Sequence, residues 1–258
     1  MTIPRIYFPR PLSPGDRYPA DVPLARYLGS VLRMRDGDPL LVFNGGPQEY
    51  DAILQSRPDG IMLAITDSRP VIADGIVTTL CQAIPKADRM EAIIRHAVEL
   101  GADRVIPFFA ARSVPRWSEE KSPQKRSRWQ KIAIEACRQC GRADLPEISE
   151  VASFATMLEA ARPEALNLIL WEEERGRGIR ETLRDQSHAG IRNFLVIIGP
   201  EGGFSEPEVQ EAKRAGCFSV SLGKRVLRVD TATAAALTAL QYERGDIGAA
   251  DRGDSHGG

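Results

Sequence analysis

Between Ile76 and Gly245 the sequence alternates short apolar runs with amphipathic segments of helical period. The apolar runs are IVTTLCQAI, RVIPFF, NLILW, NFLVIIG and FSVSLG. The helical segments are RMEAIIRHAVELG, residues 123–140, SFATMLEAAR, GIRETLRDQ, SEPEVQEAKRAG and TATAAALTALQYERG. Continuous apolar runs are typical of strands buried on both faces, and strands that alternate with helices form parallel sheets. The pattern predicts an α/β domain whose parallel sheet is covered by helices on both faces.

The first ~70 residues have a different, β-rich pattern. The segment DPLLVFNGGPQEYDAILQ places two strand-like runs around NGGP and predicts a hairpin, and DGIMLAITD predicts another strand. Prolines at positions 4, 9, 11, 14, 19 and 23 predict an extended, irregular start. The chain therefore divides into a small β domain at residues 1–70, an α/β domain at 71–248 and a disordered polar tail at 249–258.

The charge is balanced overall but uneven along the chain. The formal net charge is −1, so bulk electrostatics alone do not predict a nucleic-acid-binding protein. Basic residues nevertheless dominate the first 35 residues and the stretch from Arg112 to Arg142. Two such regions predict contact with a polyanion on one face. A solvated charged face is the other explanation, and for any single basic run it is the commoner one.

The sequence predicts a cytoplasmic protein. The start, MTIPRIYFPRPL, lacks the apolar core of a signal peptide, and no apolar run approaches the length needed to span a membrane. Four cysteines in 258 residues do not form a disulfide scaffold. Cys137 and Cys140 form a C-x-x-C on a predicted helix, where they share a face with apolar residues. One such pair is a weak metal signal, so we expect buried thiols and no metal site.

A glycine-rich loop, IIGPEGGFSEPE, follows one of the predicted strands. Its glycines permit close backbone approach, and Ser205 with Glu208 forms a capping box that predicts a helix start. The spacing is neither a dinucleotide-binding fingerprint nor a P-loop, and Glu201 would repel a phosphate. The loop is therefore either a tight turn or a site for a ligand that lacks phosphate or is positively charged, such as S-adenosylmethionine. Ligands bind at this end of parallel strands.

The next predicted strand leads into a basic loop, SLGKRVLRVDTATAAALTAL. Lys224, Arg225 and Arg228 stand between the strand and the last predicted helix. Asp230 or Thr231 is expected to cap that helix. For Asp230 a cap and a functional carboxylate are equally supported by the sequence.

Four blocks of the sequence, in order, resemble the RsmE family of ribosomal RNA methyltransferases in the SPOUT superfamily. They are KADRMEAIIRHAVELGADRVIP, RWQKIAIEACRQCGRADLPEI, IIGPEGGFSEPE and LGKRVLRVDTATAAALTALQ. The resemblance extends from about Arg5 to Gly245. It implies an N-terminal β-barrel related to PUA domains and a C-terminal domain tied as a trefoil knot. It also implies a homodimer that transfers methyl from S-adenosylmethionine to N3 of one uridine in 16S rRNA of the small ribosomal subunit.

The resemblance also implies roles for particular residues. The expected cofactor-binding residues are Leu170, Trp171, Ile198, Gly199, Glu201, Gly202, Leu222, Val226 and Leu227. Arg228 would stabilise charge on the uracil, and Asp230 would take the N3 proton. The family usually has Thr-Glu where Val229 and Asp230 stand here. The expected RNA contacts are Arg5, Tyr7, Arg33, Lys86, Arg112 and Arg142, with Tyr7 stacking on a base.

Two other functions fit parts of the sequence. One is an RNA-binding ribosome assembly factor without catalytic activity, against which the intact glycine loop and Arg228 argue. The other is a nucleotide-dependent oxidoreductase, which the missing dinucleotide fingerprint disfavours.

Overall fold

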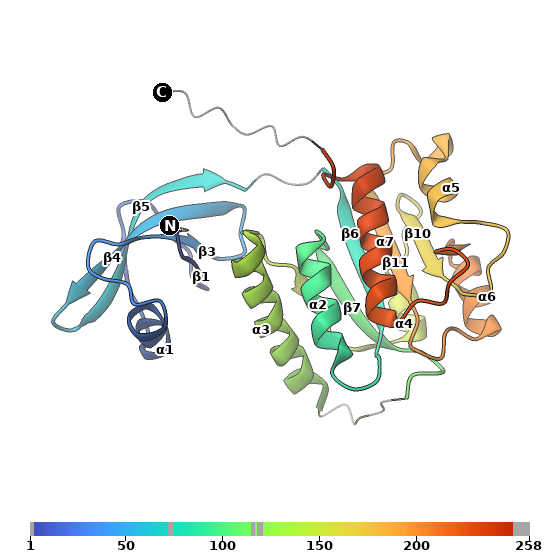
Figure 1. Cartoon of the computed structure of the whole chain (residues 1–258), viewed down its shortest axis with the longest axis horizontal. Helices are drawn as coiled ribbons and strands as arrows, with labels where there is room; N and C mark the ends of the chain where they lie inside the picture. The colour runs from blue at the N-terminus through green and yellow to red at the C-terminus, as the bar shows by residue number, and fades with distance from the viewer. Residues whose placement is uncertain (1–2, 72–74, 115–116, 118–120, 250–258) are drawn as a thin grey trace. The chain divides into compact units, whose positions relative to one another are not determined.

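The computed structural model of the 258-residue chain describes residues 3–71, 75–114, 117 and 121–249 (Figure 1). The chain forms two compact units, each with its own sheet. Unit 1 comprises Met1–Ile72 and Lys131–Pro146, and unit 2 comprises Ala73–Gln130 and Glu147–Gly258. The predicted disordered tail lies outside the described residues apart from its first position.

Unit 1 contains a five-stranded sheet in the order β1-β3-β4-β5-β2. Its strands are β1 Arg5–Tyr7, β2 Arg17–Pro19, β3 Pro39–Phe43, β4 Gln48–Arg57 and β5 Gly60–Pro70. β3 and β4 pair antiparallel across the NGGP turn, which confirms the predicted hairpin. One side of the sheet packs on a core that includes Ile6, Leu28, Val42, Leu54 and Leu63.

The proline-rich start is more regular than the sequence predicts. β1 pairs parallel with β3, and Asp21 caps the short helix α1 (Val22–Arg26), which continues as a π-helix at Tyr27–Val31. Pro23 stands in the first turn of α1, where the missing N–H costs no hydrogen bond. The expectation of an irregular start is therefore confirmed for residues 8–16, which form no helix or strand, and wrong for residues 22–31.

Residues 131–146 group with unit 1 although the sequence alone places them in the second domain. The Arg138 guanidinium lies 4.3 Å from the centre of the Tyr27 ring, and its Nε donates to the Arg5 carbonyl. Gly45 and Asp144 form an isolated parallel bridge. These contacts join residues about a hundred positions apart, so no local pattern could have revealed them.

Unit 2 contains a seven-stranded sheet whose main order is β12-β10-β11-β6-β7-β8, with β9 also pairing with β7. Its strands are β6 Val77–Ala83, β7 Arg104–Phe109, β8 Glu147–Ile148, β9 Ala152–Ser153, β10 Leu166–Leu170, β11 Asn193–Ile198 and β12 Phe218–Val220. Every pairing in this sheet is parallel. The predicted parallel α/β sheet is therefore confirmed.

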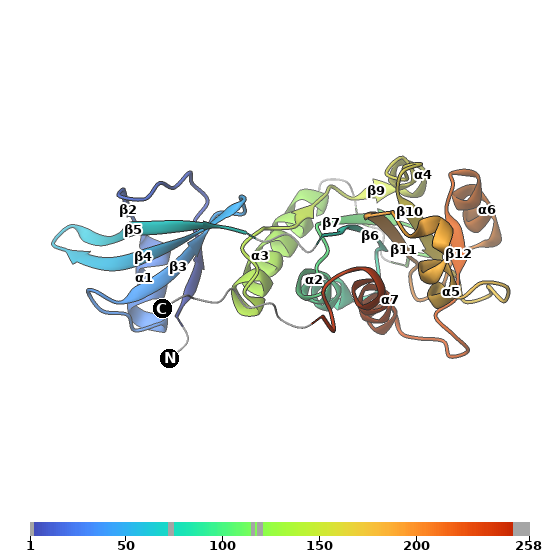
Figure 2. The same cartoon turned by 90° about the horizontal axis from the view of Figure 1, so that it is seen from above.

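Helices cover both faces of this sheet. They are α2 Arg89–Glu99, the first half of α3 (Ser122–Cys140, whose residues from Lys131 on group with unit 1), α4 Phe154–Leu158, α5 Ile179–Arg184, α6 Glu206–Arg214 and α7 Val229–Arg244, with a 3₁₀ turn at Gln186–His188. Within unit 2, α2 and α7 lie side by side on one face, and α4 and α6 lie on the other (Figures 1 and 2). On the α2 and α7 face, Thr233 and Gln82 form a buried hydrogen bond that attaches α7 to β6.

The C-x-x-C pair does not share one buried face. Cys137 is fully buried and donates weakly to the Asp144 carbonyl, whereas Cys140 is exposed. The expectation that both thiols are buried is therefore wrong for Cys140. In the described part of the chain no group of three His, Cys, Asp or Glu side chains is placed to hold a metal ion. Nor does that part contain a helix that could cross a membrane.

Candidate functional site

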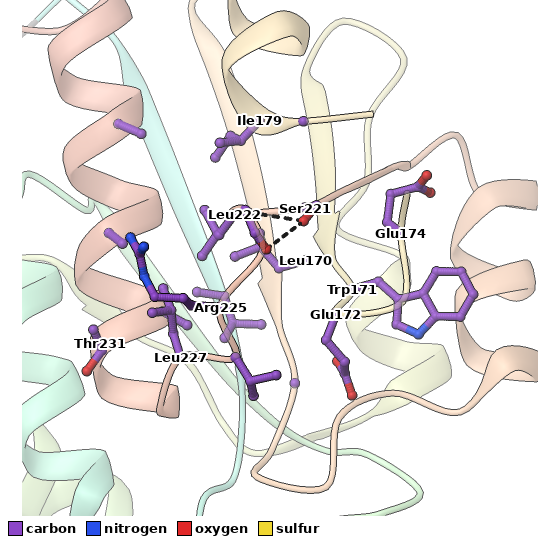
Figure 3. Close-up of a pocket in the computed structure, with 18 of the residues that line it drawn as sticks. Leu170, Trp171, Glu172, Glu174, Ile179, Ser221, Leu222, Arg225, Leu227 and Thr231 are labelled. Carbon is purple, nitrogen blue, oxygen red and sulfur yellow. Dashed lines mark hydrogen bonds between the residues drawn. The ribbon is translucent and has the colours of Figure 1, made fainter. Parts of the chain in front are cut away.

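A cavity of about 1990 Å³ opens in unit 2 where three neighbouring strands end (Figure 3). Its walls come from the segments that follow β10, β11 and β12 and from α5 and α7. Parallel strands present their carboxyl ends at one edge, so segments far apart in sequence meet there. Figure 3 shows Arg225 beside α7 on one side and Trp171, Glu172 and Glu174 on the other.

The structure brings most of the predicted cofactor residues together in this cavity. Those that line it are Leu170, Trp171, Ile198, Gly199, Glu201, Leu222, Val226 and Leu227. Arg228 also lines it, but Gly202 and Asp230 do not. The three predicted segments are therefore adjacent in space, while two of the predicted residues, Gly202 and Asp230, face elsewhere.

Gly202 lies against the loop that follows β7. A Cβ atom on Gly202 would stand 3.1 Å from Arg112 Cβ, and Arg112 Nη1 donates to the Gly202 carbonyl at 3.0 Å. The helix start after the loop also contacts this region, because Glu208 accepts from Ser205 N and from Ala111 N. The predicted capping box is confirmed. Its glutamate also holds the β7 loop against the glycine loop.

The Glu201 carboxylate has partners within the protein. Both of its oxygens lie 3.1 Å from the Lys86 backbone nitrogen, which donates to them, and Oε1 lies 3.6 Å from Arg89 Nε. A buried or half-buried carboxylate is stabilised by such donors. Through these contacts Glu201 attaches the glycine loop to the turn between β6 and α2, which explains why an acidic residue stands in this loop.

Asp230 does not cap the last helix, and that expectation is wrong. α7 begins at Val229 with Arg228 at the cap position, and no side chain makes the cap hydrogen bond. Asp230 instead faces α2, where its Oδ1 lies 3.7 Å from Arg89 Nη1. This oxygen is buried and accepts no hydrogen bond.

Arg89 is a cavity residue that the sequence analysis missed. It stands at the first position of α2, where the helix dipole disfavours a cation. A cation at the start of a helix was therefore the feature of the sequence that could have identified Arg89. The structure compensates for this charge by placing two carboxylates, Glu201 and Asp230, beside the guanidinium.

Two further acidic residues, also missed, line the opposite wall. Glu174 accepts hydrogen bonds from the Ser219 hydroxyl and from Gly176 N at 2.8 Å, and these bonds lower the pKa of its carboxyl. Glu172 lies so close to Gly203 that a Cβ atom there would overlap its carboxylate. The run WEEE directly after the β10 strand was the sequence signal for these two residues.

The basic loop after β12 is free of internal ion pairs. Lys224, Arg225 and Arg228 all line the cavity, and in the described structure none of them lies within ion-pair distance of a carboxylate. Charges that the fold does not neutralise are available to a ligand. The cavity therefore has a basic loop on one side, and on the other a segment where Glu172 and Glu174 stand beside Arg175 and Arg177.

The predicted RNA contacts fall into two groups. Arg5 is paired with Glu49, and Arg142 is paired with Asp144; their side chains are only 15% and 11% exposed. Both are engaged inside unit 1 and offer little to a partner. The side chains of Arg33, Lys86 and Arg112 are exposed.

Tyr7 is half-buried in unit 1. It lines a smaller cavity of about 530 Å³ together with Arg10 and Asn44. Its ring packs against Phe43 with centroids 5.5 Å apart, and burial raises the pKa of its phenol. The ring can therefore serve as one wall of a binding surface.

Comparison with known proteins identifies relatives along most of the chain. Residues 75–241 match the model of a family described as an RNA methyltransferase domain. The Bacillus subtilis ribosomal RNA small subunit methyltransferase E is 32% identical over 230 residues, 85% of this chain and 89% of that protein. Its namesake from Mycobacterium bovis is 31% identical over 232 residues, 87% of each chain.

Solved structures agree with these relatives. The structure of a ribosomal RNA small subunit methyltransferase E from Neisseria gonorrhoeae, bound to S-adenosyl methionine, superposes with a TM-score of 0.85. It is 30% identical, and the match covers 95% of this chain and 100% of that one. A putative methyltransferase from Legionella pneumophila, in complex with the same cofactor, has a TM-score of 0.83 at 31% identity, with 94% and 98% covered.

Proposed function

The chain belongs to the RNA methyltransferase family that includes the ribosomal RNA small subunit methyltransferases E, and from this membership we propose its reaction. It transfers a methyl group from S-adenosylmethionine to N3 of one uridine in the 16S rRNA of the small ribosomal subunit. The observation that carries the proposal is the single cavity that the segments after β10, β11 and β12 form, because most predicted cofactor residues line it.

The cavity suits a cofactor of this chemistry. Leu170, Ile198, Leu222 and Leu227 supply apolar surface for an adenosine, and the carboxylates of Glu172 and Glu174 suit a ligand that carries positive charge. Its volume of about 1990 Å³ exceeds the roughly 300–1000 Å³ of pockets that hold one small molecule. It therefore has room for a nucleotide beside the cofactor.

S-adenosylmethionine supplies an electrophilic methyl group; the protein has to align N3 with it and manage the charge on uracil. When N3 loses its proton, negative charge spreads to O2 and O4. Arg228 lines the cavity without an internal partner, so it can donate to one of these oxygens as the charge grows. Asp230 points to Arg89 and not into the cavity, so its position does not support direct proton removal.

RNA would be held by residues of both units. Tyr7 and Arg33 in unit 1 and Lys86 and Arg112 in unit 2 remain proposed contacts. Arg5 and Arg142 are better explained by the carboxylates that they pair with. In their place, Lys224 and Arg225 supply cations without internal partners beside the cavity.

The finer architecture is also part of the proposal. We assign residues 1–70 to a PUA-like barrel and residues 71–248 to a SPOUT domain with a trefoil knot, in a cytoplasmic homodimer. The knot is proposed from the family; in the structure the segment after β10 lies against the end of β12, where Ser221 N donates to Arg177 O and Ile179 N donates to Ser221 O. The dimer is supported by exposed apolar side chains at Val226 and Tyr242, 87% and 64% exposed.

One experiment tests the function. Small ribosomal subunits from a bacterial strain that lacks this methylation would be incubated with the purified protein and labelled S-adenosylmethionine. We expect one 3-methyluridine, located by mass spectrometry of 16S rRNA fragments, and calorimetric binding of the cofactor to the free protein. Binding of RNA without cofactor binding or methyl transfer would instead identify an assembly factor.

A further inference from the structure

Arg89 stands between two carboxylates that come from two different segments, the glycine loop and the start of α7. Its Nε lies 3.6 Å from Glu201 Oε1, and its Nη1 lies 3.7 Å from Asp230 Oδ1. Glu201 belongs to the glycine loop, and Asp230 lies in the first turn of α7, directly after the basic loop. The guanidinium therefore connects two segments that are separate in sequence.

No other polar contact of the described residues makes this connection. The hydrogen bonds of the glycine-loop residues 199–203 go to Lys86, to Arg112 or to the loop itself. Those of residues 222–230 stay within their own segment or its helix. The two segments are thus joined to each other through the start of α2.

The turn that carries Arg89 is conformationally strained. Ala87 has φ = 54°, in the left-handed region that costs an L-residue roughly 1–2 kcal/mol. Such strain persists where surrounding contacts over-determine the backbone. Here the contacts are the two Glu201 oxygens on the Lys86 amide and the two ion pairs of Arg89.

We propose that Arg89 is a positioning residue that fixes the distance between the glycine loop and the start of α7, and through it the fit of the cofactor. The inference rests on the proposed function, because the ligand whose fit it controls is S-adenosylmethionine. An ordinary exposed ion pair contributes little and would leave cofactor affinity unchanged. Arg89 differs because two carboxylates share one guanidinium, whose planar donors can serve both.

The test uses the full-length protein and calorimetric titration with S-adenosylmethionine. Arg89→Met keeps the aliphatic stem and removes the charge, and we expect the cofactor Kd to rise about tenfold, within the range measured for coupled residues. The methylation rate of Arg89→Met at saturating cofactor should differ from that of wild type by less than threefold. Arg89→Lys should recover part of the affinity, because one ammonium can reach one carboxylate but not both.

Arg95→Met is the matched control, because Arg95 is exposed on the same helix and makes no ion pair in the described structure. The double variant Arg89→Met/Glu201→Gln should bind no more weakly than the weaker single variant, since both changes break one connection. Additive losses, or an Arg89→Met Kd within twofold of that of Arg95→Met, would overturn the proposal.

A second measurement separates this inference from the proposed function. Amide hydrogen exchange of the cofactor-free protein should be faster in residues 198–203 and 222–228 of Arg89→Met than in wild type, with the β6 and β11 strands unchanged. If both loops exchange as in wild type, Arg89 does not position them. If they respond but wild type neither binds cofactor nor methylates RNA, the positioning of the loops stands while the cofactor role and the proposed function fail.

Discussion

Thr233→Val should destabilise the protein through one buried hydrogen bond between α7 and β6. Thr233 Oγ1 lies 2.8 Å from Gln82 Oε1, and both side chains are fully buried. The hydroxyl also lies 2.9 Å from the Val229 carbonyl, one helical turn earlier, but that carbonyl has the helix amide as its partner. Valine therefore leaves Gln82 Oε1 without a donor.

The cost follows from this geometry. Valine has nearly the shape of threonine, so the change creates little cavity, and the main loss is the desolvation of an unsatisfied amide oxygen. Such a loss costs about 1–3 kcal/mol, and we expect about 2 kcal/mol because the site is wholly buried. Urea denaturation should show a lower midpoint with an unchanged m-value, since the area exposed on unfolding stays the same.

A control variant and a double variant complete the test. Thr238→Val makes the same chemical change at an exposed position of α7 and should stay within about 0.5 kcal/mol of wild type. Gln82→Met combined with Thr233→Val removes both polar partners and should recover much of the loss. A Thr233→Val protein as stable as the Thr238→Val control, or a double variant less stable than either single one, would refute the reasoning.

Three further predictions address the site and its supports. Arg228→Ala should leave the cofactor Kd within a few-fold but slow single-turnover methylation roughly a hundredfold, the scale of lost charge stabilisation; a normal rate would place the active site elsewhere. Burial raises the pKa of Cys217 from 9.0 to about 12, so the folded state keeps its proton while the unfolded chain loses it, and stability should fall as pH rises above 9. Cys217→Ala should flatten that fall in urea titrations from pH 9 to 11, by about 1.4 kcal/mol per pH unit. Ala87→Gly relieves the left-handed residue and should stabilise the fold by up to about 1 kcal/mol in the same assay, after the entropy cost of glycine; a loss of stability would mean that Ala87 is not strained.

The strands and helices of unit 2 could be predicted because the chain itself carries their period. The run RVIPFF corresponds to β7 at Arg104–Phe109, and Gly245 ends α7 as expected. Turn chemistry was equally local, as the Ser205 capping box and the NGGP hairpin show. The grouping of residues 131–146 with unit 1 could not be predicted, because it depends on contacts of Arg138 and Asp144 with distant strands.

The same distinction holds for the site. Its loops could be predicted because each follows a strand, and parallel strands end at one edge of the sheet. The directions in which individual residues face could not be predicted, because they are set by distant partners. Gly202 faces Arg112 and Asp230 faces Arg89, while Glu172 and Glu174 reach the cavity from a run that carried no recognised motif.

Glu201 shows how such a partner changes the chemical argument. From the sequence its charge alone disfavoured a phosphate ligand, but in the structure the Lys86 amide and Arg89 offset that charge. Glu172 has no comparable compensation, since the described structure pairs it with no cation. Local attraction for the positive centre of a ligand should therefore come from Glu172 more than from Glu201, on the Trp171 side of the cavity.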